Sequence, residues 1–346
     1  MNTHALKALC PSFLLSTVLP WFSVTLSVTA ATEEHLTKNF TVQPGGKLVV
    51  QVDMGSIDVS TNSGNTVAVD VWRKIGRSKK ADEEAYLRDH PVEFKQDGDT
   101  ITVTCRSKVK NSSWNFAGHM QNEAKFTITV PGNFNAKLET AGGGISASDL
   151  TGDVKADTSA GGLKFAHLHG PLTGNTSGGG IHVTDCEGKI GINTSAGGIT
   201  IAGGSGSLKA DSSGGAITMK KFHGPADIHT SAGGITLEEV TGEIRADTSG
   251  GGIKAALPAP LAGPVKLETS AGGITVQLAA SAAFDLDAET SAGTVTSELP
   301  VTAAARHEHS RLKGSVNGGG PRMYLRSSGG SIHLLKSPRF LAEEPK

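Results

Sequence analysis

The stretch NTSAGGITI at residues 193–201 decides the fold, because close copies of it recur along the chain at a fixed spacing. NTSGGGIHV occupies residues 175–183, DSSGGAITM residues 211–219 and HTSAGGITL residues 229–237, so each copy follows the last by eighteen residues. The apolar residue after the glycines, which we call the landmark, keeps this spacing six times in succession. These landmarks are Ile145, Leu163, Ile181, Ile199, Ile217, Ile235 and Ile253. Self-similarity at a fixed period predicts a stack of repeated units.

Other columns of the repeat show the alternation of β-strands. The position two residues after the landmark is mostly apolar, as in Phe165 and Val183, and a column of glycine runs from Gly152 to Gly242. Apolar and polar residues alternate with period two on both sides of that column. This pattern predicts that each repeat forms two short strands joined by two tight corners. One corner contains the glycine column, and the other contains the glycine pair before the landmark, where we expect positive φ angles.

The predicted fold class is all-β: a single-stranded β-solenoid (β-helix) with about eighteen residues per coil, preceded by a less regular β-rich part with one short helix. A single coil holds too few inward apolar side chains to close a core, so it is stable only in a stack. Further landmarks follow at Ile274, Val295 and Ile332, with wider steps. A proline-rich insertion at residues 258–264 accounts for the first wider step and should bulge from the glycine-column corner.

Four segments are predicted: a signal peptide at 1–30, a β-rich part at 31–135, the repeat array at 136–336 and a polar tail at 337–346. The signal peptide combines Lys7 with a long uncharged apolar run and small residues before the cleavage site. The alternative is an uncleaved anchor, because the run is about long enough to span a bilayer. We therefore expect an exported protein that is periplasmic, at the cell surface or secreted.

The β-rich part contains strand-like runs at residues 48–52, 66–71 and 100–104. Gly98 marks a hairpin turn, and residues 81–90 are the one helix candidate, with Ser78 near its start. Residues 108–122, which include Trp114 and Phe116, are predicted to form a long loop.

Composition excludes several classes of partner and chemistry. Lys and Arg number 32 against 33 Asp and Glu, which gives a net charge of −1 and predicts no nucleic-acid partner. The 45 glycines recur on the period, which favours an ordered array over disorder. Cys186 falls at an inward position, so a buried free thiol is expected, and a bridge to Cys105 is the alternative.

Several stretches resemble the bacterial putative-adhesin β-strand-repeat domain, a domain of unknown function related to auto-transporter-adhesin-like head domains. They are FTVQPGGKL at 40–48, GSIDV at 55–59, VEFKQDGDT at 92–100, ITVP at 128–131, LTGDV at 150–154 and VNGGGP at 316–321. The similarity covers roughly residues 36–335. It implies an extracytoplasmic, β-helical and adhesin-like protein, and it supplies no catalytic residues.

Two polar columns flank an inward threonine column and are the candidate binding surface. The first column is Glu139, Asp157, Asn175, Asn193, Asp211, His229, Asp247, Glu268 and Glu289. The second is Ser159, Ser177, Ser195, Ser213, Ser231 and Ser249. One interpretation is a surface for sugar or cation binding. The other is a set of side-chain ladders that hydrogen-bond along the stack while the acids stay solvated.

No catalytic, cofactor or metal site is predicted. The calcium-binding nonapeptide pattern of some solenoids is absent. The pair His167 and His169 has no further ligands nearby in the sequence, and neither does the pair His307 and His309. A serine that recurs in copy after copy cannot be a unique nucleophile. If the chain were an enzyme, the best candidates would be Arg306, His307, Glu308, His309 and Arg311.

The sequence thus predicts a non-enzymatic interaction, adhesin-like or scaffold protein of the cell envelope, whose partner is an unknown envelope protein or polysaccharide. Self-association through the ends or edges of the solenoid is a further expectation. One alternative is a polysaccharide-active β-helix enzyme, although the regular period leaves little room for catalytic loops. Another is a self-assembling filament like the cytoplasmic bactofilins, against which the export signal argues.

Overall fold

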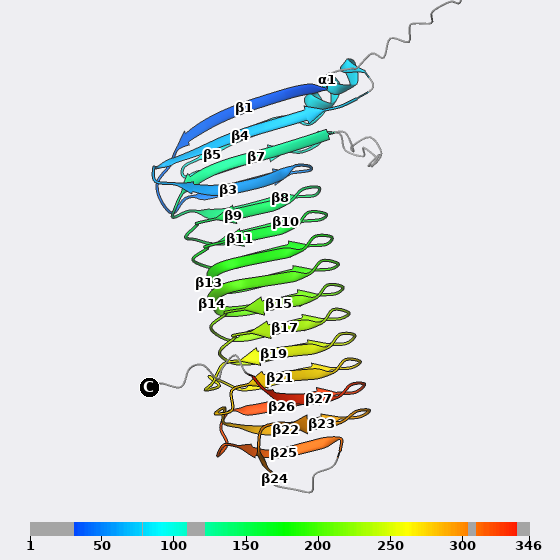
Figure 1. Ribbon diagram of the computed structural model, residues 1–346. Coiled ribbons are helices and arrows are strands. Elements are labelled where there is room, and N and C mark those ends of the chain that lie inside the picture. Colours follow the sequence, from blue (N-terminus) through cyan, green and yellow to red (C-terminus); the bar gives the residue numbers. More distant parts are fainter. Residues whose placement is uncertain (1–30, 78, 109–121, 304–308, 338–346) are drawn as a thin grey trace, which may run out of the picture.

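The computed structural model describes residues 31–77, 79–108, 122–303 and 309–337, and over these it has 27 strands in one sheet and a single helix. Figure 1 shows the strands stacked one above another in a long rod that does not close into a barrel. The all-β prediction is confirmed. The signal segment 1–30, Ser78, the loop residues Trp114 and Phe116, and residues 338–346 lie outside the described residues. No helix in the described part is long and apolar enough to cross a bilayer.

The strands form two faces, and we call a pair of consecutive strands with its corners a rung. In spatial order the ladder face consists of β5 (Val92–Asp97), β6 (Thr100–Cys105), β2 (Lys47–Val52), β8 (Asn135–Thr140), β10 (Val154–Thr158), β12 (Leu172–Thr176), the ends of β13 (Ile181–Thr194) and β14 (Ile199–Ser212), β16 (Ala226–Thr230), β18 (Ile244–Thr248), β20 (Val265–Thr269), β26 (Arg322–Ser327), β22 (Phe284–Thr290), β25 (Arg311–Val316) and β24 (Val301–Ala303).

The landmark face consists of β1 (Thr32–Thr41), β4 (Thr66–Ile75), β7 (Asn122–Pro131), β3 (Ser56–Asn62), β9 (Ile145–Ser148), β11 (Leu163–Ala166), the beginnings of β13 and β14, β15 (Ile217–Lys220), β17 (Ile235–Glu238), β19 (Ile253–Leu257), β21 (Ile274–Leu278), β27 (Ile332–Lys336) and β23 (Val295–Ser297). β13 and β14 continue through a corner and belong to both faces.

The landmark residues lie directly above one another. Ile181 is the Cα partner of Ile199, and Ile199 is the partner of Ile217, with each side chain at most 1 % exposed. Inward side chains from both faces fill one continuous core, which extends into the first rungs through Leu48 and Ile57. β2 pairs with β8 and β3 with β9, so part of the less regular N-terminal segment forms an ordinary rung of the same stack.

The order of the rungs in space departs from their order in the sequence at both ends. Sequence order alone would place Val295 directly on Ile274, but Ile332 lies between them as the partner of both. The last repeat, β26 and β27, is thus inserted between β20/β21 and β22/β23, as Figure 1 shows. At the other end, β2 and β3 are inserted between β6/β7 and β8/β9.

Antiparallel strands border the parallel stack at its two ends. β1 runs antiparallel to β4, β4 to β7 and β5 to β6, while β25 runs antiparallel to both β22 and β24. α1 (Lys80–Asp89) confirms the predicted helix and lies beside β1, where Glu83 accepts a hydrogen bond from Thr32. The parallel ladder thus ends in antiparallel strands at β5, β1 and β24, while β23 is the outermost parallel strand of the landmark face.

The corner at the glycine column needs glycine for its backbone conformation. Every member from Gly152 to Gly242 has a positive φ. The residue three places earlier is also left-handed although it carries a side chain in five copies, a feature that we did not foresee. These residues are Asp149, His167, Asp185, Lys221 and Glu239.

The corner before the landmark needs glycine for a different reason, and the positive φ predicted there is wrong. Gly161 and Gly179 do not have positive φ. A Cβ added to Gly179 would instead lie 2.2 Å from the carbonyl oxygen of Gly161 in the preceding rung. Neighbouring rungs therefore approach too closely at this point for any side chain.

Candidate functional site

The residues before and after each inward threonine form two outward rows, which we call the polar ladder. Successive residues of the first row are Cα partners in neighbouring parallel strands. The serines of the second row follow two residues later in each rung. The first row is Asp157, Asn175, Asn193, Asp211, His229 and Asp247, and all six are partly or fully exposed. The second row is Ser159, Ser177, Ser195, Ser213, Ser231 and Ser249, and all six are exposed.

The buried threonine column holds the polar ladder in position. The hydroxyl of Thr194 donates to the carbonyl oxygen of Gly179 at 2.8 Å and accepts from the N–H of Gly197 at 3.2 Å. The same pair of bonds recurs in the neighbouring rungs, with Ser212 taking the place of threonine once. Each corner is therefore tied to the rung before it by a side chain as well as by the backbone.

Contacts within the polar ladder offset repulsion between its carboxylates. Nδ2 of Asn175 donates to Oδ1 of Asp157 at 2.8 Å, and His229 is paired with Asp247. Lys155 lies 3.7 Å from Asp157 on the same strand. The row is thus a mixed hydrogen-bonding surface and not a line of bare negative charge.

The first half of the polar ladder lines a shallow groove of about 460 Å³. Asp53 and Arg106 form its rim at the end of β2 and β6, and its floor contains Asn175, Asn193 and Ser195. The groove therefore exposes amide, hydroxyl and charged groups side by side. Such groups can donate and accept hydrogen bonds from a polar ligand.

Glu139 joins the groove to its charged rim. Nζ of Lys137 lies 2.8 Å from its carboxylate, Arg106 lies 3.2 Å away, and Gln51 donates at 2.7 Å. The hydrogen bond from Lys137 is the largest cause that lowers the pKa of Glu139, with burial acting in the opposite direction. The lowered pKa favours the ionised form of Glu139.

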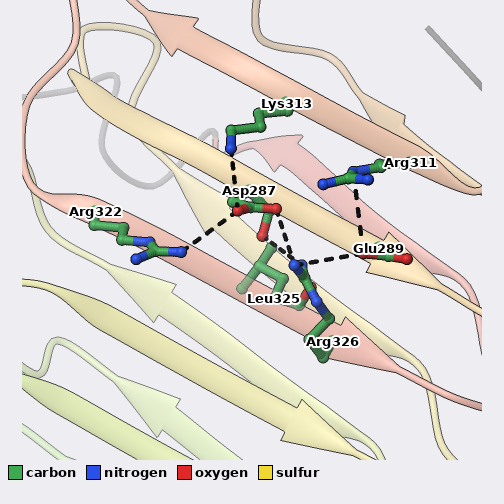
Figure 2. A network of polar contacts seen from close by, with 7 residues as sticks. All are labelled: Asp287, Glu289, Arg311, Lys313, Arg322, Leu325 and Arg326. Carbon is green, nitrogen blue, oxygen red and sulfur yellow. Dashed lines mark hydrogen bonds and ion pairs between the residues drawn. The ribbon is translucent and has the colours of Figure 1, made fainter. Parts of the chain in front are cut away.

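A second polar cluster, which the repeat pattern did not predict, surrounds Asp287 of β22. Figure 2 shows that Arg326 and Arg322 from the inserted β26 and Lys313 from β25 all point toward this carboxylate. The nitrogen–oxygen distances are 3.0 Å for Arg326, 3.4 Å for Arg322 and 3.7 Å for Lys313. Burial of Asp287, which is 7 % exposed, would raise its pKa, but Arg326 and the other cations hold it below its usual value.

The inserted rung also breaks the acidic row of the ladder face. Arg326 is the Cα partner of both Glu268 and Glu289, and its guanidinium lies 3.4 Å from Glu289. In sequence order the two glutamates would have been neighbours. The insertion therefore places a cation where two like charges would otherwise meet.

Stability should depend on pH through Asp287. Because its pKa is lowered in the folded state, its contribution is present above the ordinary carboxyl pKa and is lost as the pH falls through the folded value. We expect Asp287→Asn to lower the urea midpoint at neutral pH and the difference from wild type to vanish in acid. Asp285→Asn, an exposed change in the same strand, is the control. An unchanged gap between wild type and Asp287→Asn in acid would contradict the assignment.

Comparison with known proteins places this architecture in a family. The family model described as Toastrack DUF4097 matches residues 46–335. The chain belongs to this family. The match confirms the resemblance found in the sequence and covers both the N-terminal rungs and the repeat array. No curated protein matches the chain.

Solved structures similar to the Toastrack chain include proteins described in adhesion terms. A putative adhesin from Parabacteroides distasonis shows 14 % identity and a TM-score of 0.42, over 87 % of this chain and 97 % of that one. A putative adhesin from Parabacteroides merdae shows 14 % identity and a TM-score of 0.41, over 87 % and 96 %. A putative cell adhesion protein from Clostridium sporogenes shows 13 % identity and a TM-score of 0.23, over 88 % and 100 %. At these values no property of those proteins carries over to this chain.

The remaining candidates from the sequence do not assemble into a site in the described part of this Toastrack chain. His167 contacts Asp149 at 3.0 Å and His169 contacts Glu187 at 3.2 Å, both at the exposed corner. No group of three or more potential metal ligands occurs among the described residues. Arg306, His307 and Glu308 lie outside them. Of the other enzymatic candidates, His309 follows that gap and Arg311 lies 4.0 Å from Glu289.

Both cysteines of the described chain are buried and free. Burial raises the pKa of the Cys105 thiol and, independently, that of Cys186. The structure therefore supports the buried thiol expected for Cys186 and contains no bridge between the two. Neither thiol has the low pKa of a reactive nucleophile.

Proposed function

We propose that the chain is a non-enzymatic, extracytoplasmic interaction or scaffold protein of the cell envelope. In this proposal it is an exported β-solenoid with about eighteen residues per coil, and its polar ladder binds a repetitive partner. The observation that carries the proposal is the in-register repetition of the polar ladder from Asp157 to Asp247 along one face.

Repetition favours a polymer over a small ligand. Equivalent hydrogen-bonding groups recur at each rung, about 4.8 Å apart. A polymer with repeated polar groups can contact several rungs at once, and weak contacts that are linked in this way add to a useful affinity. The groove supplies a place where Asn193 and Ser195 are accessible together.

The test is a binding screen of the purified protein against a polysaccharide array and envelope extracts, with sugar-release assays alongside. We expect reproducible binding without turnover. Ser195→Arg places a bulky charge in the groove and should weaken that binding about tenfold or more. Ser207→Arg, a matched change at an exposed position at the other corner, should leave it unchanged.

Other outcomes would count against the proposal. Reproducible release of sugar from any glycan would replace it with the polysaccharide-active alternative. Polymers of the protein in electron micrographs would favour the filament. Equal effects of Ser195→Arg and Ser207→Arg would show that the groove is not the binding surface.

A further inference from the structure

The inserted rung brings the aromatic ring of Tyr324 into a group of basic side chains. Tyr324 lies between Lys266 of β20 and Asp287 of β22 as the Cα partner of both. The guanidinium carbon of Arg326 is 4.1 Å from the ring centroid, that of Arg322 is 5.3 Å away, and Nζ of Lys266 is 5.7 Å away. These distances place all three cations within reach of the ring.

A hollow of about 420 Å³ opens beside this ring. Arg245, Lys266 and Arg322 contribute its basic groups, and Pro264 contributes apolar surface. We call Tyr324 with these three basic residues the Tyr324 shelf. Glu243 is the one acidic residue of the lining, and it is paired with Arg245 at 2.7 Å. The lining therefore contains three basic residues against one acidic residue, while two acids outside the lining pair with its cations, Glu268 with Lys266 at 2.7 Å and Asp287 with Arg322 at 3.4 Å.

Two of these cations remain accessible to a ligand. The side chain of Arg322 is 65 % exposed and that of Lys266 is 50 % exposed. Asp287 contacts Arg322 from beneath, while Arg326 is held by Asp287 and Glu289 and packs on the ring. Figure 2 shows this anchoring on the side of β22. The buried carboxylate thus orients the guanidinium groups and leaves Arg322 exposed to solvent.

From this geometry we propose that the Tyr324 shelf binds an acidic sugar unit of an anionic polysaccharide. A carboxylate of the sugar would contact Arg322, whose guanidinium matches a planar carboxylate with two parallel hydrogen bonds, and Lys266, whose ammonium adds a further charged donor. The C–H face of the sugar ring would lie against Tyr324 and Pro264. An aromatic ring beside a few charged donors is suited to this combination of apolar and anionic surface.

The inference deepens the proposed function, on which it rests, by naming the chemical class of the polymer. The outward residues of β20 and β26 lie on the same face as the polar ladder, so one chain of sugar could reach both. A nucleic acid fits less well, because the shelf offers one aromatic ring and no extended basic stripe.

The test measures binding of sodium polygalacturonate, with dextran as the uncharged comparison, by titration calorimetry on the whole protein. We expect polygalacturonate to bind and dextran not to bind, with affinity falling as salt rises. Lys266→Gln together with Arg322→Gln, and separately Tyr324→Leu, should each weaken binding about tenfold or more. If circular dichroism shows that the other variants fold poorly, Arg322→Gln alone replaces them, because this residue is well exposed. It should also weaken binding of polygalacturonate.

A matched control separates a site from general attraction. Lys155→Gln together with Lys209→Gln removes the same charge from the same face, where each lysine also contacts one acid. We expect this double variant to bind within about twofold of wild type. Equal losses in the two double variants, or a DNA duplex that binds as tightly and with the same sensitivity to Arg322→Gln, would overturn the proposal. If polygalacturonate does not bind but another partner binds through the groove, the shelf inference fails while the proposed function stands.

Discussion

Gly179→Ala is expected to destabilise the stack by at least about 3 kcal/mol, which is among the largest effects of a single added methyl group. The new Cβ would lie 2.2 Å from the carbonyl oxygen of Gly161 and 2.4 Å from its carbonyl carbon. Both atoms belong to the hydrogen-bonded backbone of the preceding rung. The clash therefore cannot be relieved by the movement of a flexible side chain. The measurement is the urea midpoint, with hydrogen exchange at β12 and β13 to locate the loss.

Gly180→Ala is the matched control for this prediction. Its Cβ would lie 3.1 Å from the oxygen of Gly198, a tight but tolerable contact. The chain itself carries Ala216, Ser331 and Thr294 at this position of the repeat. We expect a change below about 1 kcal/mol. Similar losses for the two glycines would show that corner flexibility, and not the close approach of rungs, is the reason for glycine.

Thr194→Val should cost about 2–3 kcal/mol, although the two side chains have nearly the same shape. Thr194 is fully buried, and its hydroxyl serves both the carbonyl oxygen of Gly179 and the N–H of Gly197. Valine would leave both backbone groups without this partner in a partly buried corner. A buried polar group that loses its partner pays most of its desolvation cost. The loss should appear as a lower urea midpoint.

Thr194→Ser tests whether the hydroxyl is what matters. Ser212 makes the equivalent bonds in the next rung, to Gly197 at 2.9 Å and from Gly215 at 2.9 Å. We therefore expect serine at residue 194 to retain most of the stability. A loss as large as that of Thr194→Val would instead assign the effect to the missing methyl group and its packing.

Most of the central stack could be predicted from the sequence, because its rungs are stacked in the order in which they are written. The landmarks, the inward threonines and the outward polar ladder all follow from one period and from the alternation of strand residues. The ladder was found for this reason. Its use as a binding surface is a proposal, because a polar residue that recurs in each repeat can serve either the packing of the stack or the binding of a ligand.

The order of the rungs at the two ends of the stack could not be predicted from the period. Rungs with similar hydrogen-bonding edges can stack in any order. One signal was available in the residue three places before each landmark. Glycine and alanine alternate there through the stack: Gly142, Ala160, Gly178, Ala196, Gly214, Ala232, Gly250, Ala271, Gly329 and Ala292. In sequence order Ala292 would follow Ala271 and break the alternation, and the inserted Gly329 restores it. Gly329 indeed lies against Ala271, because a Cβ added to Gly329 would be 3.1 Å from the carbonyl oxygen of Ala271.

The Asp287 cluster was missed for the same reason. Its partners Arg322 and Arg326 lie more than thirty residues later in the chain and become neighbours only through the insertion. Strand β22 is acidic and strand β26 is basic, and this complementarity could have suggested that they pair. The left-handed column gave a partial signal, because Asp149, His167 and Asp185 are of residue types enriched in this conformation, whereas Lys221 and Glu239 are not.

The insertion of β26 and β27 has a mechanical consequence for force applied to the C-terminal end of the chain. β27 is hydrogen-bonded to β21 on one side and to β23 on the other. Traction applied beyond Lys336 therefore cannot peel off an outermost strand one bond at a time. The force must instead pull β27 out from between β21 and β23 and break both rows of backbone hydrogen bonds together. A solenoid stacked in sequence order would end in a strand with only one such row.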